Sequence, residues 1–162
     1  LTTLLLTAAV PAASASEVAT SRNLGLGIIL GLPTGPTLKY HFNQRHAFDL
    51  AVGFGFLGGN NISIHADYLF QFPLLKKRPF DFAFYMGIGG RVISWFDNKG
   101  KRYYGGSDAD GRVGLAVRVP FGISFNLNKV PLEIFLELVP GVGFFPATGF
   151  AIDAALGVRY YF

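Results

Sequence analysis

Three residues with the side chains of a hydrolytic triad lie close together in the sequence, at Ser63, His65 and Asp67. Such a triad needs its hydroxyl, imidazole and carboxylate groups within hydrogen-bonding reach of one another. Their alternating spacing instead places all three on one face of a single β-strand, where residues two apart lie roughly 6.5–7 Å from each other. A triad would need partners from neighbouring strands, so we predict no catalytic residues here.

Metal and cofactor chemistry has little support either. The chain has no cysteine and three histidines, and His41 and His65 lack the dense ligand spacing of a metal site. The sequence Gly25-x-Gly27 opens no predicted helix, so it does not indicate a nucleotide site. We predict neither a metal nor a cofactor.

The elements that position these residues are short alternating segments. The 162-residue chain is 51% hydrophobic and 15% charged, yet beyond its first positions it has no apolar run of the ~18 residues that a membrane-spanning helix needs. Turn residues such as Pro33-Thr34-Gly35 and Gly58-Gly59-Asn60 separate the segments. The pattern predicts eight strands, at residues 23–31, 35–42, 46–57, 61–72, 80–95, 111–125, 131–143 and 149–162.

Alternation within these strands separates apolar from charged side chains. In the last strand Phe150, Ile152, Ala154, Leu156, Val158, Tyr160 and Phe162 oppose Gly149, Ala151, Asp153, Ala155, Gly157, Arg159 and Tyr161. No charged residue falls on the apolar face of any predicted strand. The apolar face carries the bulkiest residues, and they would overfill an eight-stranded interior. We therefore predict an eight-stranded antiparallel transmembrane up-and-down β-barrel over residues 23–162, with its apolar face toward lipid.

Loop lengths predict the orientation of this barrel. Barrels of this kind have short periplasmic turns and longer outer loops. The longest connection, 96–110, is then outside, and 43–45, 73–79 and 126–130 are periplasmic together with both termini. Pro120 and Pro140 fall inside predicted strands, where proline cannot donate to the ladder, so we expect β-bulges or earlier strand ends there.

The first fifteen residues are typical of part of a secretory signal. An apolar stretch, 4–10, precedes the small-residue sequence Ala13-Ser14-Ala15, which suits cleavage before Ser16. We assign 1–15 to the signal and 16–22 to a short periplasmic segment; a retained apolar N-terminal arm is the alternative.

The chain ends on Gly157-Val158-Arg159-Tyr160-Tyr161-Phe162, which resembles the C-terminal strand by which outer-membrane barrels are recognised for assembly. Further matching segments are Gly25–Gly31 with Pro33-Thr34-Gly35, His65–Phe70 and Gly87–Arg91. On these residues the chain resembles the small eight-stranded bacterial barrels of the OmpA transmembrane-domain type, within a family that offers no established catalytic residues. The resemblance implies an integral protein of the Gram-negative outer membrane. It also implies Tyr160 and Phe162 as an assembly signal for the barrel assembly machinery.

The predicted interior carries a nearly balanced set of charges. The expected lumen network comprises Lys39, Asp49, Asp67, Asp81, Arg91, Arg112, Arg118, Glu133, Glu137, Asp153 and Arg159. Unpaired charges in a narrow lumen are costly, so we expect these groups to pair and crosslink the wall. The excess of positive charge lies in the periplasmic turns, where it suits contact with lipid headgroups rather than nucleic acid.

The outer half of the lumen is rich in glycine, including Gly53, Gly55, Gly89 and Gly114. One interpretation is a shallow cavity open to the outside and filled by loop 96–110 with Trp95, Tyr103 and Tyr104. The other is that these glycines relieve strain where strands coil tightly.

Together these patterns predict a non-enzymatic, structural outer-membrane barrel with a salt-bridged lumen. Outer-membrane lipids are its expected partners, and Trp95, Tyr103 and Tyr104 are candidates for loop-mediated interaction. Two alternatives stay open, namely a narrow or gated pore and a lipid-modifying enzyme.

Overall fold

The computed structural model describes residues 22–55, 60–77, 79–96, 113–127, 129–146 and 148–162. Nine strands are β1 (Leu24–Gly31), β2 (Gly35–His41), β3 (His46–Gly55), β4 (Asn61–Lys77), β5 (Phe80–Trp95), β6 (Val113–Arg118), β7 (Phe121–Leu127), β8 (Leu132–Phe145) and β9 (Gly149–Tyr161). Within these ranges no helix has the length and apolar character to cross a membrane. The signal segment predicted at 1–15 lies outside the described residues.

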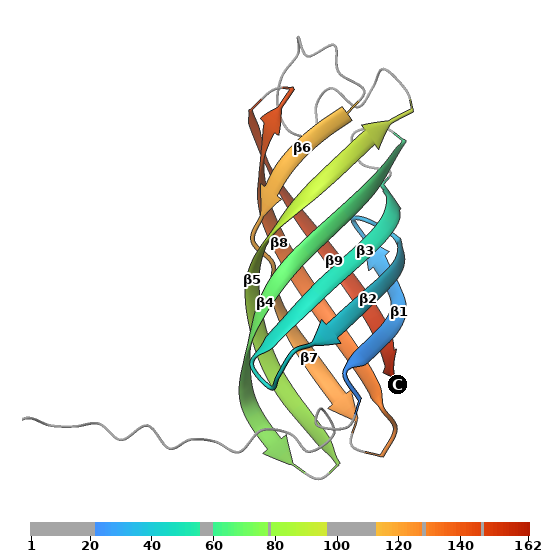
Figure 1. The fold of residues 1–162 in the computed structure, drawn as a ribbon, viewed down its shortest axis with the longest axis vertical. Coiled ribbons are helices and arrows are strands. Elements are labelled where there is room, and N and C mark those ends of the chain that lie inside the picture. The colour runs from blue at the N-terminus through green and yellow to red at the C-terminus, as the bar shows by residue number, and fades with distance from the viewer. Residues whose placement is uncertain (1–21, 56–59, 78, 97–112, 128, 147) are drawn as a thin grey trace, which may run out of the picture.

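The strands pair antiparallel with their neighbours and close into a ring (Figure 1). β1 pairs with β2 on one side and with β9 on the other, which joins the first strand to the last. β6 and β7 both lie between β5 and β8, so they are two halves of one interrupted strand. Counted in this way the ring has eight strands, and the predicted eight-stranded barrel is confirmed.

Two prolines explain the interruption. β6 ends at Arg118 and β7 begins at Phe121, because Pro120 has no N–H for the ladder. On the neighbouring strand, the carbonyl of Pro140 accepts a hydrogen bond from the Val119 N–H at 2.9 Å. The N–H and C=O of one strand residue point to the same neighbour, so the donor that Pro140 lacks would point at this break. β8 itself runs through Pro140 in unshifted register with β9, so the bulge expected there is absent from that pairing.

Two strands continue further than predicted. We expected a turn at 73–79, but β4 continues through Pro73 to Lys77, with a bulge between Pro73 and Leu75. Pro73 still pairs with Ala83, the extra residue of the bulge is Leu74, and pairing resumes at Leu75 with Phe82. β7 likewise extends to Leu127, across part of the turn expected at 126–130.

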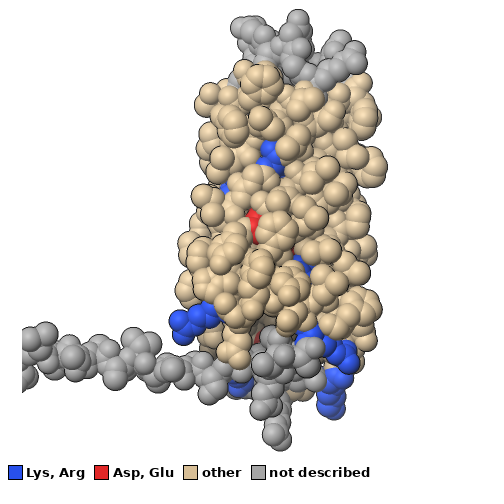
Figure 2. All heavy atoms as spheres, in the orientation of Figure 1, with Lys and Arg blue, Asp and Glu red and all other residues tan. Residues whose placement is uncertain are grey.

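Side chains alternate between a charged interior and an apolar exterior. Lys39 and Arg159 are fully buried inside the ring, whereas Ile28 and Phe150 are 58% and 63% exposed on its outer wall. Figure 2 shows this wall as an almost continuous surface of uncharged residues, with basic side chains gathered near its lower end. A soluble protein hides its apolar side chains and exposes its charges. The observed arrangement is the reverse, as predicted.

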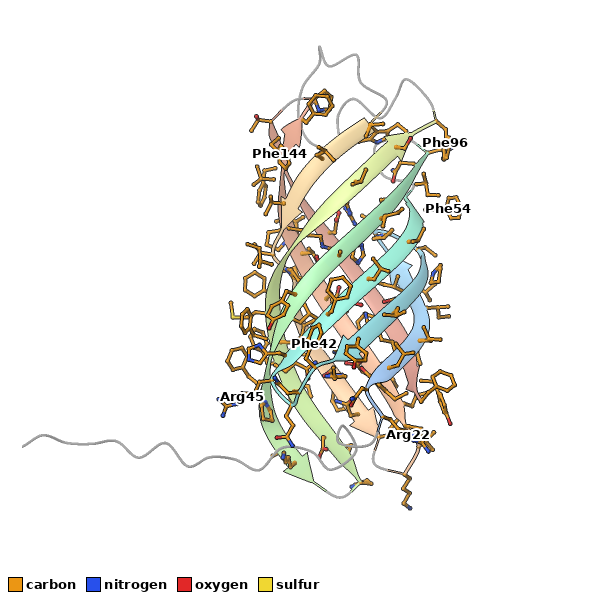
Figure 3. The ribbon with its side chains drawn as sticks, viewed as in Figure 1. Arg22, Phe42, Arg45, Phe54, Phe96 and Phe144 are labelled. Atoms are coloured by element: carbon orange, nitrogen blue, oxygen red, sulfur yellow. The ribbon has the colours of Figure 1, made fainter. Side chains whose placement is uncertain are left out.

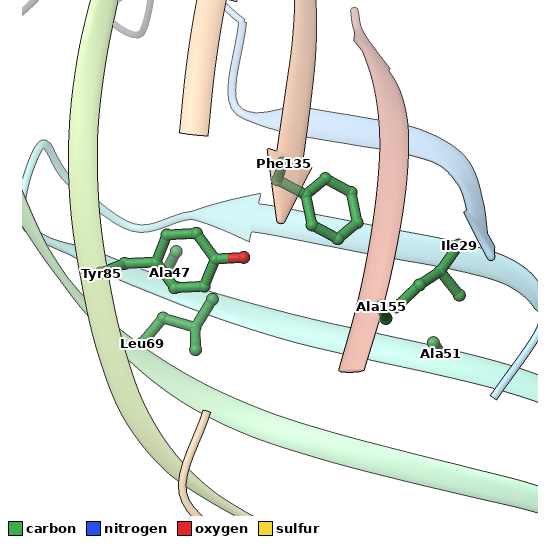
Figure 4. Close-up of a cluster of buried hydrophobic side chains, with 7 residues drawn as sticks. All are labelled: Ile29, Ala47, Ala51, Leu69, Tyr85, Phe135 and Ala155. Atoms are coloured by element: carbon green, nitrogen blue, oxygen red, sulfur yellow. The ribbon is translucent and has the colours of Figure 1, made fainter. Parts of the chain in front are cut away.

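The interior is filled by side chains of several strands. One buried apolar cluster contains Ile29, Ala47, Ala51, Leu69, Tyr85, Phe135 and Ala155 (Figure 4). Its two large rings have glycine as cross-strand partners, because Tyr85 pairs with Gly122 and Phe135 pairs with Gly157. A Cβ at Gly122 would lie 2.2 Å from the Tyr85 ring. The glycines therefore make room for the rings, which favours packing over an open cavity at this level.

Candidate functional site in the charged lumen

The predicted lumen charges are the chemically richest part of the molecule. Arg112 lies outside the described residues. The other ten are all buried, namely Lys39, Asp49, Asp67, Asp81, Arg91, Arg118, Glu133, Glu137, Asp153 and Arg159. They lie at inward-facing positions of seven of the nine strands, namely β2, β3, β4, β5, β6, β8 and β9. Most of these side chains form three layers along the barrel axis, which we call lower, middle and upper in the orientation of Figure 1.

The lower layer consists of Lys39, Asp49, Glu133 and Arg159. Lys39 Nζ on β2 lies 2.7 Å from Glu133 Oε1 on β8, and Arg159 Nη2 on β9 lies 2.6 Å from Asp49 Oδ2 on β3. Arg159 Nη1 also approaches Glu133 Oε2 at 3.4 Å. The strands in each short pair are not neighbours in the ring, so both pairs cross the bore. This layer contains two cations and two carboxylates and joins opposite walls of the barrel.

Uncharged groups complete the lower layer. The Tyr161 hydroxyl donates to Glu133 Oε2 at 2.6 Å, and the Thr37 hydroxyl donates to Asp49 Oδ1 at 3.2 Å. The His41 ring hydrogen-bonds the Tyr161 hydroxyl at 3.0 Å. In addition, the Arg159 guanidinium stacks 3.8 Å from the centre of the Phe135 ring. Buried charges are tolerated when they are paired and hydrogen-bonded in this way.

The middle layer consists of His65, Asp67, Arg118 and Glu137. Arg118 Nε lies 3.2 Å from Asp67 Oδ2, and Arg118 Nη2 lies 3.9 Å from Glu137 Oε2. The Tyr85 hydroxyl donates to Glu137 Oε1 at 2.7 Å. The ring nitrogens of His65 and Nη1 of Arg118 have no hydrogen-bond partner in the part of the chain that the structure describes. This layer is therefore less completely satisfied than the lower one.

The upper layer is a cross-lumen pair between Arg91 on β5 and Asp153 on β9. The Arg91 guanidinium also donates to the Leu32 carbonyl at 3.1 Å. Above this pair a small recess is lined by Leu32, Pro33, Gly55, Asn61, Ser63, Arg91 and Ile93. A Cβ at Gly55 would lie 2.6 Å from the Asn61 amide, so this glycine makes room for a lining side chain.

The triad considered from the sequence does not assemble. Ser63 lines the recess. Within the described residues the His65 ring nitrogens make no hydrogen bond, and His65 Nε2 lies 3.9 Å from Asp67 Oδ2. Three or more metal-ligating side chains do not come together anywhere in the described ranges. His41 and His65 belong to different layers of the lumen.

The interaction residues predicted for the outer loop have different outcomes. Tyr103 and Tyr104 lie outside the described residues. Trp95 is the last residue of β5, as predicted, and it is buried beside Ile93 and Ala116, which leaves little of its side chain for contact with a partner. A Cβ at Gly114 would lie 2.5 Å from the indole ring. The tryptophan fits inward because its neighbour is glycine.

Several members of the lower and middle layers were missed from the sequence. Tyr85, Tyr161 and Thr37 hydrogen-bond the buried carboxylates. The predicted lumen network did not include them because it was built from charged side chains alone. The alternation of side chains along a strand would have predicted two of them. Tyr85 is four residues from Asp81, and Tyr161 is two residues from Arg159, so each shares the inward face of its strand. Tyr160 and Phe162, which the sequence predicts as an assembly signal, face outward with ring centres 5.0 Å apart.

Comparison with known proteins identifies a family and two similar barrel structures. A family described as "Protein of unknown function (DUF3996)" matches residues 15–160. No curated protein matches the chain. The crystal structure of the N-terminal β-barrel domain of Pseudomonas aeruginosa OprF is similar, with 14% sequence identity, a TM-score of 0.53, and coverage of 86% of this chain and 96% of that one. Neisserial surface protein A also matches at 14% identity, with a TM-score of 0.44 and coverage of 86% and 94%. At this identity the OprF domain shows a shared barrel fold.

Proposed function

The chain belongs to the DUF3996 family of proteins of unknown function, and we propose that it is a non-enzymatic β-barrel of the bacterial outer membrane whose lumen is closed by paired charges. Its role in this proposal is structural, with the connection between β5 and β6 available for interaction outside the cell. The apolar outer wall supports the membrane location, and the paired charges of the lumen support the closed state.

The outer wall supports a membrane location. Large apolar side chains, among them Leu30, Ile64, Leu136 and Ile152, are about half exposed along its length. An apolar surface that encircles a closed barrel needs lipid around it. Among the described strands, closure of the ring also leaves no unpaired sheet edge to face the hydrocarbon.

The lower layer supports a closed lumen and is the observation on which the function rests. The Lys39–Glu133 and Arg159–Asp49 pairs cross the bore, and Tyr161 and Phe135 pack against them. An ion entering here would have to separate buried charge pairs, each of which loses several kcal/mol when one partner is left alone (about 3–5).

For the orientation we propose that the lower end is periplasmic. The strand ends His41, Lys77 and Leu127, each followed closely in sequence by the next strand, lie at the same end as the C-terminus. The much longer connection from Trp95 to Val113 leaves from the opposite end, which suits the outer side. The C-terminal strand β9, with Tyr160 and Phe162 outward, is the segment that we propose the barrel assembly machinery recognises.

A gated pore is the second candidate. The incompletely hydrogen-bonded middle layer and the recess above Arg91 favour it, because both are polar and lie on the path through the barrel. The enzymatic alternative is less well supported, since Ser63 and His65 face the lumen rather than the acyl chains. We expect the lipid A mass spectrum to be unchanged when the protein is expressed.

Single-channel conductance of the refolded barrel in planar bilayers tests the closed lumen. We expect no current steps over a range of voltages, with insertion verified separately by flotation with liposomes. Discrete and reproducible steps would overturn the closed-lumen proposal and make Arg118 and Glu137 the first residues to test as a gate.

A further inference from the structure

The charges on the described surface have one sign. All six carboxylates in the described ranges are buried, namely Asp49, Asp67, Asp81, Glu133, Glu137 and Asp153. The exposed charged side chains there are Arg22, Arg45, Lys76 and Lys129. Figure 2 shows basic side chains gathered near the lower end of the barrel. This end of the described surface is therefore cationic without acidic neighbours.

A cluster of five aromatic rings lies on the outer wall near this end. It consists of Tyr40, Phe42, His46, Tyr68 and Phe70, and we call it the β2–β4 ring cluster. The Tyr40 and Phe42 rings are 5.3 Å apart, the Phe42 and Tyr68 rings 6.2 Å apart and stacked, and the His46 and Phe70 rings 5.3 Å apart. The His46 Nδ1 and Tyr68 hydroxyl are hydrogen-bonded at 3.0 Å. The cluster thus combines apolar ring faces with polar ring edges.

Arg45 is held at a defined place at the border of this cluster. Its N–H donates to the Asn43 side-chain oxygen at 2.9 Å, and its carbonyl accepts a hydrogen bond from the Gln71 N–H of β4 at 2.8 Å. The next residue, His46, also donates its N–H to Asn43 at 3.0 Å. Figure 3 shows Phe42 and Arg45 in the lower part of the barrel, far from Phe54, Phe96 and Phe144 at the other end. The backbone at Arg45 is therefore fixed, while its guanidinium is exposed.

The chemistry of this surface matches one class of ligand. A guanidinium binds phosphate in a fixed geometry through several donors, and aromatic rings at the membrane interface suit the glycerol and upper acyl region beneath a headgroup. We propose that the β2–β4 ring cluster with Arg45 is a binding site for one anionic phospholipid. Arg45 contacts the phosphate, and the rings of Phe42, Tyr68 and Phe70 contact the chain region. This inference rests on the proposed membrane location of the barrel.

Other basic residues at this end provide a contrast. Lys129 follows β7, whose nearby ring cluster is made of Phe80, Phe82 and Phe125. That cluster contains phenylalanine alone and lacks the hydrogen-bonded His46–Tyr68 pair. If a diffuse positive field were sufficient, Lys129 and Arg45 would contribute equally to lipid binding. A defined site requires Arg45 to contribute more.

Native mass spectrometry of the full chain, refolded in detergent micelles and titrated with phosphatidylglycerol, tests the site. We expect Arg45→Gln to weaken the first bound phosphatidylglycerol by about fivefold, the loss expected for one basic side chain near an anionic lipid. Arg45→Lys should retain most of the affinity, and Lys129→Gln should change it by less than about twofold. Tyr68→Ala, which removes one of the rings proposed to contact the lipid, should weaken binding without any change in charge.

Two outcomes would overturn the site. Equal losses for Arg45→Gln and Lys129→Gln would show diffuse attraction, and equal binding of zwitterionic phosphatidylcholine would show that the headgroup charge is not recognised. Flotation with liposomes and circular dichroism on the same samples report insertion and folding separately. A barrel that fails to insert contradicts the proposed function, whereas an inserted barrel without selective binding contradicts the lipid site alone.

Discussion

Gly157 on β9 lies directly opposite Phe135 on β8, and a Cβ built on Gly157 would come within 2.2 Å of the Phe135 ring. The same ring stacks against the guanidinium of Arg159, 3.8 Å from its centre. The glycine therefore does more than permit strand coiling. It lets an aromatic ring fill the bore immediately beside the lower ion-pair layer.

A methyl group at Gly157 should destabilise the barrel. Gly157→Ala forces the buried Phe135 ring or the backbone to move, which costs roughly 1–3 kcal/mol of unfolding free energy. Urea titration in lipid bilayers, followed by fluorescence, measures this loss. Gly90→Ala is the matched control, because a Cβ there meets its nearest neighbour at 3.9 Å, and it should change stability by less than about 0.5 kcal/mol. Equal effects of the two substitutions would refute the packing argument.

Arg159 should be the most costly lumen charge to remove. It is fully buried, and it contacts both Asp49 and Glu133. Arg159→Met leaves two buried carboxylates short of a partner, so we expect a loss of about 3–5 kcal/mol of unfolding free energy. Lys129→Gln removes an exposed charge and should stay within about 0.5 kcal/mol of the unchanged protein in the same urea titration. A small loss at Arg159 would mean that the lower layer does not lock the barrel.

The two layers should differ in pairwise coupling. Lys39 and Glu133 approach to 2.7 Å, whereas Arg118 and Glu137 approach only to 3.9 Å. Double-mutant cycles with Lys39→Met and Glu133→Gln, and with Arg118→Met and Glu137→Gln, give the two coupling energies. Coupled neighbours show about 0.5–3 kcal/mol, and we expect the first cycle near the top of that range and the second near its bottom. The reverse order would contradict the observed geometry.

The facing of the side chains could be predicted from the sequence, but their pairing could not. Strand alternation has a period of two, so Asp153 and Arg159 must share a face whatever the details of the fold. The contact between Lys39 and Glu133, which are 94 positions apart, depends on strand stagger and tilt around the closed ring. No single strand carries that information. The bounds of β5 agree with the prediction, whereas the end of β4 does not, because a bulge at Pro73 allows pairing where a turn was expected.

Trp95 illustrates a second limit of the sequence. Alternation puts Trp95 on the same face as the buried Arg91 and Ile93, but it does not show whether there is room inside for an indole ring. Here Gly114 on the next strand leaves space inside. The inward rotamer therefore depends on a neighbour 19 positions away in the sequence.

The burial of this single tryptophan can be measured. Trp95 is 8% exposed and faces the interior, so its emission should be blue-shifted and brominated lipids should quench it weakly. The variant Trp95→Phe with Phe144→Trp moves the indole to the apolar wall, where Phe144 is 54% exposed, and there the same lipids should quench it strongly. Strong quenching of Trp95 itself would place it against lipid and contradict the inward orientation.

Substitutions at Phe162 allow an effect on assembly to be separated from an effect on stability. Phe162 is 63% exposed on the outer wall, and its N–H donates to the Leu24 carbonyl at 2.9 Å across the seam where β9 meets β1. Its side chain therefore adds no packing to the lumen, while its backbone helps to close the ring. Phe150 lies near the start of β9, the strand that Phe162 directly follows, and has the same exposed fraction, so it is the matched control. If Phe162 is recognised during assembly, Phe162→Ala should lower the amount of folded barrel in the outer membrane several-fold, whereas Phe150→Ala should not. Both purified variants should refold in detergent with similar unfolding free energies, because each loses one lipid-facing ring.

Quantitative immunoblots of outer-membrane fractions, compared with urea titrations of the purified variants, distinguish an effect on assembly from an effect on stability. Equal outer-membrane levels of the two variants would remove the assembly role of Phe162 and leave it as one more residue of the lipid-facing wall.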